Sequence, residues 1–167
     1  MLSQPADREV ELSPVLLAAV SREHYGIHFD TIGERWWMMS KVPAGFEDLL
    51  RRPIVGVLAT VTPHGSPDQT PMRFTWDGAH LRMSHTIPRR KFTSLQANPN
   101  YSFLITDPDA PSRVLEAQGW LVTVKGDADG SFYSTLNELY GEPEKGLPAD
   151  VNDRVVLLLD ATRFIAK

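Results

Sequence analysis

The sequence predicts a mainly β domain of the α+β class, a closed antiparallel barrel of six strands with a few peripheral helices. From Ile54 onward, short segments rich in β-forming residues follow one another. Their connections have hairpin length, and the pair Asp77-Gly78 suits a type I′ turn. Helical patterns are short and lie between these segments. We expect strands at residues 54–62, 68–76, 79–86, 101–106, 114–125 and 155–159, the last extended by 162–165.

Composition narrows the class of function. A chain of 167 residues can bury a core in one domain without covalent cross-links. The net charge of −4 argues against general nucleic-acid or membrane-surface binding. The absence of cysteine excludes disulfides, thiol catalysis and cysteine-ligated metals. Residues 1–10 contain no apolar stretch of signal-peptide or membrane-spanning length, so we expect a cytoplasmic protein.

Helices are expected at residues 46–52, about 89–97 and 131–140, and in an N-terminal extension of residues 1–45. In the extension, Ser13-Pro14 begins a helix as a hydroxyl cap followed by proline. The bulky apolar patch Trp36 to Met39 must be buried somewhere. It forms either a lid over a planar ligand or a core or dimer contact. His24 and His28 have a metal-ligand spacing, but no third ligand is near, so we expect no metal site.

The segment from Thr86 to Pro99 is the most informative for function. It follows a predicted strand and contains a hydroxyl, three consecutive cations (Arg89, Arg90 and Lys91), a short helix and an Asn-Pro stop. Unpaired first-turn amides, the helix dipole and cationic side chains together make an anion site, and phosphate is the obvious guest. The alternative is a solvated run of surface charges.

Other positions carry weaker expectations. Pro71, within a predicted strand, favours the edge of a sheet or a backbone that faces a ligand. Trp120, Val122 and Val124 are expected to share one strand face. His85 lies at the end of a strand that leads to the phosphate turn, and it either contacts the ligand or is structural.

An ordered set of short motifs resembles the pyridoxamine 5′-phosphate oxidase-like split β-barrel superfamily over about residues 46–167, and most closely its branch that uses the deazaflavin coenzyme F-420. The motifs are Leu58-Ala59-Thr60, Gly65-Ser66-Pro67, Pro71-Met72-Arg73-Phe74, Asp77-Gly78, Ser84-His85-Thr86, Arg89-Arg90-Lys91, Leu95 and Asn98-Pro99. The resemblance implies a split-barrel domain at 46–167, a homodimer with two interfacial cofactor sites, and residues 1–45 outside the shared pattern.

The resemblance also implies site residues. The phosphate of FMN, or the phospholactyl group of the deazaflavin, would lie at Thr86, Arg89 and Lys91, and the ring system beside Thr70, Pro71 and Met72. The candidate cofactor-binding residues are therefore Thr70, Pro71, Met72, Ser84, His85, Thr86, Arg89, Arg90 and Lys91. The FMN-binding pattern has a serine at the position of Arg89, and an arginine there is similar to the deazaflavin branch.

The expected activity is that of an oxidoreductase that transfers hydride from reduced deazaflavin, or alternatively FMN, to a planar small molecule such as an enone. In such enzymes the cofactor carries the hydride chemistry, and no catalytic acid is identified from this sequence. The alternative is a flavin- or haem-binding protein without turnover.

Overall fold

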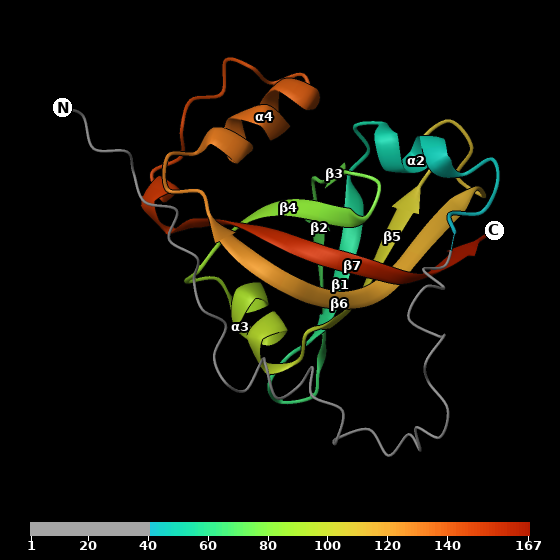
Figure 1. Ribbon diagram of the computed structural model, residues 1–167, viewed down its shortest axis with the longest axis horizontal. Helices are drawn as coiled ribbons and strands as arrows, with labels where there is room; N and C mark the ends of the chain where they lie inside the picture. Colours follow the sequence, from blue (N-terminus) through green and yellow to red (C-terminus); the bar gives the residue numbers. More distant parts are fainter. Residues whose placement is uncertain (1–40) are drawn as a thin grey trace.

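The computed structural model describes residues 41–167 (Figure 1). The predicted helix at Ser13, the patch from Trp36 to Met39, the pair His24 and His28, and most of the expected extension lie outside the described residues.

The described chain forms one antiparallel sheet that curls into a split barrel (Figure 1). Its order is β2-β1-β5-β6-β7-β4-β3, so β2 and β3 are the two end strands. This confirms the edge position that Pro71 predicts, because an end strand does not need an amide at every residue. The strands are β1 (Gly56–Val61), β2 (Pro67–Met72), β3 (Thr75–Trp76), β4 (His80–Thr86), β5 (Asn100–Thr106), β6 (Val114–Gly126) and β7 (Arg154–Ala166).

Within residues 41–167 the sheet has seven strands where the sequence predicts six. The predicted strand 68–76 is divided at Arg73 and Phe74 into β2 and β3. At the break, the amide of Phe74 donates to the Tyr140 hydroxyl at 3.1 Å, and this hydroxyl lies 2.9 Å from the carbonyl oxygen of Ile54. A distant side chain therefore replaces the strand partner that Phe74 would otherwise need.

The core lies inside the curl of the sheet. Phe74 and Phe103 meet there edge to face, with ring centroids 5.0 Å apart. Gly56 lies against the Phe103 ring, and a Cβ at this position would come within 2.3 Å of that ring. Other buried members are Leu49, Leu58, Leu81, Met83, Leu95, Ile105, Leu115, Leu121, Val124, Leu157 and Leu159.

A register shift in β6 corrects one expectation. The pairing with β7 skips Val122, between Leu121 and Thr123. The extra residue reverses the alternation, so Leu121 and Val124 are both buried while Val122 is exposed. The prediction that Trp120, Val122 and Val124 share one face is wrong for this reason.

Three α-helices flank the barrel in the described part of the chain: α2 (Glu47–Arg51), α3 (Arg90–Ala97) and α4 (Ser131–Leu139). A 3₁₀ turn, η2 (Val151–Asp153), precedes β7. Helix α4 covers the outer face of β7 through a small cluster of Phe132, Leu136 and Val156. Of the helices in residues 41–167, none has the length and apolarity needed to cross a membrane.

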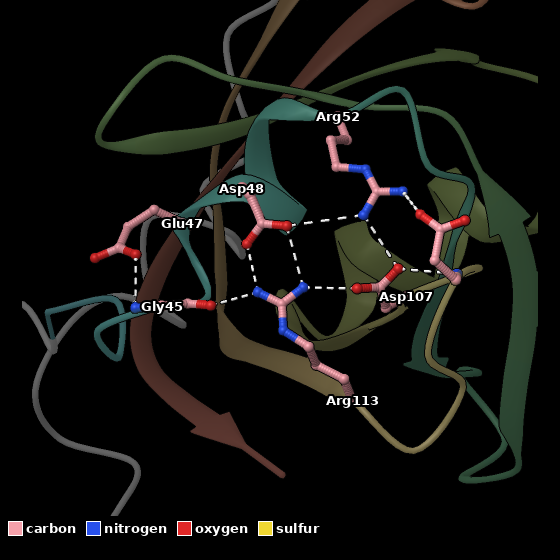
Figure 2. A network of polar contacts seen from close by, with 7 residues as sticks. Gly45, Glu47, Asp48, Arg52, Asp107 and Arg113 are labelled. Atoms are coloured by element: carbon pink, nitrogen blue, oxygen red, sulfur yellow. Dashed lines mark hydrogen bonds and ion pairs between the residues drawn. The ribbon is translucent and has the colours of Figure 1, made fainter.

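A charged clasp fastens α2 to the loop between β5 and β6 (Figure 2). The Arg113 guanidinium donates to both carboxylate oxygens of Asp48, to Asp107 at 2.7 Å and to the carbonyl oxygen of Gly45. Arg52 donates to Asp107 from the other side at 3.1 Å. Figure 2 shows the two guanidinium groups on either side of Asp107. A helix of five residues is too short to be stable by itself, so these contacts with the rest of the fold stabilise α2.

Candidate functional site

One pocket of about 340 Å³ contains all the residues predicted for cofactor binding. It lies where the two ends of the sheet approach each other, between β2, β4 and the start of α3. The lining residues are Asp68, Thr70, Pro71, Met72, Ser84, His85, Thr86, Arg89, Arg90, Lys91 and Arg154. Nine of these are the residues predicted from the sequence, and Asp68 and Arg154 are additional.

The split of the barrel creates this pocket. Strand β2 ends the sheet on one side, and on the other side β3 pairs only with Leu81 and Arg82 of β4. The last four residues of β4, Met83 to Thr86, therefore extend beyond β3 toward the start of α3. Strand edges offer backbone donors and acceptors to a bound molecule. Pro71 has no backbone N–H, so this position of β2 offers no donor.

The three consecutive cations have different environments. The side chains of Arg89 and Arg90 are 62% and 74% exposed. Lys91 is 3% exposed, and its ammonium donates to Leu58 O at 3.3 Å and Thr60 Oγ1 at 3.3 Å, both on β1. Burial lowers the pKa of Lys91, although its partner Asp68 opposes the shift. The segment is thus not a uniform run of solvated charges, because the buried Lys91 ties α3 to β1 while Arg89 and Arg90 are exposed.

Asp68 of β2 supplies the negative charge for this group. Its carboxylate contacts Lys91 Nζ at 3.2 Å and Arg90 Nη2 at 2.9 Å, and its carbonyl oxygen accepts from Lys91 at 3.0 Å. Burial alone would raise the pKa of Asp68, but the hydrogen bond and charge of Lys91, followed by the charge of Arg90, lower it. The carboxyl group is therefore ionised at neutral pH.

Arg154 forms the opposite wall at the first residue of β7. The buried guanidinium donates to Ser84 Oγ at 2.9 Å and to Asp150 at 3.3 Å, and it stacks 4.1 Å from the ring centroid of Tyr133. Asp150 also contacts Arg89 at 3.2 Å. The sequence position of Arg154 could have indicated its role. It is a cation directly before an apolar strand, and a charge buried at such a position needs a specific partner.

His85 is a buried imidazole in the lining of the pocket. It is 6% exposed, and its Nε2 has no hydrogen-bond partner among the described residues. Burial, reinforced by the charges of Arg89, Lys91 and Arg154, lowers the pKa of His85 to about 4. The imidazole is therefore uncharged at pH 7, and a bound molecule can supply the missing hydrogen bond.

These residues suit an anionic group attached to a planar body. Arg89, Arg90 and Arg154 supply positive charge to the pocket, while Pro71 and Met72 line it with apolar surface. The unpartnered nitrogens His85 Nε2 and Arg154 Nε are buried donors or acceptors that a phosphate or a ring heteroatom could satisfy. Within residues 41–167, no cluster of acidic, histidine or cysteine side chains is arranged to hold a metal ion.

Comparison with known proteins agrees with this geometry. Residues 42–167 match the family model of pyridoxamine 5′-phosphate oxidase. A solved structure of an F-420 reductase is 44% identical, with a TM-score of 0.72, and the alignment covers 74% of this chain and 98% of that one. A conserved hypothetical protein from Mycobacterium tuberculosis shares the fold at 21% identity and TM-score 0.57, over 80% of this chain and 88% of that one. No curated protein sequence gives a match. The matched segment contains every strand and every pocket residue described above, and the chain therefore belongs to the pyridoxamine 5′-phosphate oxidase family.

Proposed function

We propose that this protein is an oxidoreductase that binds a flavin-type cofactor in the pocket between β2, β4 and α3, and that it prefers the deazaflavin F-420 to FMN. The observation that carries the proposal is the convergence of cationic, neutral polar and apolar residues on one pocket. The family and the 44% identity to an F-420 reductase support a flavin-type cofactor and reductase chemistry. The arginine at position 89 supports the deazaflavin.

The roles of the chain's own residues follow from their positions. Arg89 and Arg90 are exposed arms that can reach a phosphate from the solvent side. Arg154 is held by Ser84 and offers a fixed charge from within. His85 contributes an uncharged imidazole, so its hydrogen bond does not change with pH near neutrality.

The bound cofactor would supply hydride to an electrophilic carbon, such as the β-carbon of an enone, while the protein supplies orientation and keeps water away. Tyr25, Tyr101 and Tyr133 are possible proton donors by residue type, but neither Tyr101 nor Tyr133 lines the pocket. The Tyr101 hydroxyl donates to the carbonyl oxygen of Asp160, and burial raises its pKa. Tyr133 lies under Arg154, and Tyr25 is outside the described residues.

We further propose that the protein is a homodimer in which the partner completes each pocket. A single chain leaves the pocket open along the split of the barrel, so a second copy can provide the wall that excludes water. Light scattering at micromolar concentration should then give about twice the chain mass of 18.7 kDa. A monomer would remove the two-chain site but not the cationic pocket.

Fluorescence titration with FMN and with F-420 tests the cofactor assignment. The Arg89→Ala variant should lose about ten- to a hundredfold in affinity, because a charge-assisted hydrogen bond contributes about 1.5–3 kcal/mol. Arg163→Ala is the matched control, since it removes the same charge from an exposed position of β7 outside the pocket. Equal affinity in the wild type and in Arg89→Ala would contradict the assignment.

Turnover distinguishes an enzyme from a carrier. Reduced F-420 and cyclohexenone should give oxidised cofactor only in the presence of the protein. Tight cofactor binding without turnover of any enone would support a binding protein instead, and a Soret band on titration with haem would identify the haem-binding alternative.

A further inference from the structure

A carboxylate in a pocket that receives an anion is unexpected, and Asp68 is such a carboxylate. Its side chain is 11% exposed, so water screens it only in part. Its carboxylate is held by two specific ion pairs, since Oδ2 contacts Lys91 Nζ and Oδ1 contacts Arg90 Nη2. Any phosphate bound beside Arg90 also lies near this negative charge.

Lys91 cannot turn away from Asp68 to meet the ligand. An ammonium has three donors, and those of Lys91 are shared among Leu58 O, Thr60 Oγ1, Asp68 O and the Asp68 carboxylate. Arg90 differs, because its side chain is largely exposed and can leave Asp68. Asp68 therefore remains a fixed negative charge in the pocket, while the Arg90 side chain is free to move toward a ligand.

We infer that Asp68 is a specificity-determining residue that disfavours a phosphomonoester dianion relative to a phosphodiester monoanion. This inference rests on the proposed function, and it deepens that function by assigning the cofactor preference to a residue. Repulsion by a fixed charge grows in proportion to the charge of the group bound beside it. FMN carries a terminal monoester with about −1.5 to −2 charges at pH 7, whereas the phosphoryl group of F-420 is a diester with one. Asp68 therefore penalises FMN about twice as strongly.

Asp68→Asn tests this with three fluorescent probes: FMN, F-420 and riboflavin, which has no phosphate. At a separation of about 6 Å in a half-wet pocket, each unit of ligand charge should be worth roughly tenfold in affinity. The variant should bind F-420 about tenfold more tightly than the wild type does. Its gain in affinity for FMN should be larger than this by a further factor of up to about ten, and its affinity for riboflavin should not change. Asp109→Asn is the charge-matched control, because Asp109 is exposed, pairs with Arg52 and does not line the pocket.

A second pair of variants keeps the test decisive if Asp68→Asn fails to fold because buried Lys91 loses its charged partner. Lys91→Met and the double variant Asp68→Asn with Lys91→Met differ only at Asp68, and neither contains a buried unpaired ammonium. The double variant should bind FMN more tightly than Lys91→Met, by a larger factor than it gains for F-420.

Equal gains for FMN and F-420, or no gain for FMN, would overturn the role of Asp68 while leaving the proposed cofactor site intact. A wild-type protein that binds none of the three probes would instead refute the proposed function, and this inference with it.

Discussion

His85 should make the stability of the protein depend on pH between 7 and 5. The folded protein holds this imidazole with a pKa of about 4, because the side chain is buried beside Arg89, Lys91 and Arg154. In the unfolded chain the pKa returns to about 6.5. Between these values the unfolded state binds the extra proton, so acid favours unfolding. The stabilisation is complete above about pH 6.5 and is lost as the pH falls toward 4.

The two pKa values give the size of the effect. Lowering the pH from 7 to 5 should cost the wild type about 2 kcal/mol of unfolding free energy through this one group. Other groups titrate over the same range, so the comparison is with His85→Gln, which keeps a neutral polar side chain. The difference in unfolding free energy between pH 7 and pH 5 should be about 2 kcal/mol smaller in the variant.

Urea denaturation followed by tryptophan fluorescence measures this difference. His64→Gln is the control, because it removes an imidazole from an exposed turn. We expect this control to follow the wild type at both pH values. If His85→Gln shows the same pH dependence as the wild type, His85 is not held in its neutral form, and its proposed role as an uncharged ligand contact fails.

Two further predictions concern the scaffold. Tyr140→Phe should destabilise the protein by about 1–3 kcal/mol in urea denaturation, because the Phe74 amide and the Ile54 carbonyl lose their shared partner; an unchanged midpoint would show that the strand break does not depend on Tyr140. Arg113→Met should destabilise the protein only slightly in urea denaturation, and by less in high salt, because the Arg113 ion pairs are partly exposed and screened by salt. FMN affinity should not change in Arg113→Met, since no clasp residue lines the pocket, and a loss of affinity would mean that α2 helps to shape the site.

Most of the barrel could be predicted from the sequence because its signals are local. Alternating hydrophobicity and turn residues such as Asp77-Gly78 depend on neighbours within a few positions, and the hairpin from β3 to β4 lies where they predict it. The expected helices at 46–52, 89–97 and 131–140 also appear, with ends that differ by at most one residue. Pro71 marked an edge strand through its missing amide.

The sequence also identified the segments that line the pocket, because residues 70–72, 84–86 and 89–91 were all expected at the cofactor site and all line it. The tertiary structure decided how those residues are used. Asp68 meets Lys91 across 23 positions, and Arg154 meets Ser84 across 70. The first contact depends on how α3 packs beside β2, and the second depends on the pairing of β4 with β7. No pattern of neighbouring residues specifies either arrangement. For the same reason, the tertiary structure decided the burial of Lys91 and the strand break at the Tyr140 hydroxyl, because the partners of both side chains come from distant parts of the chain.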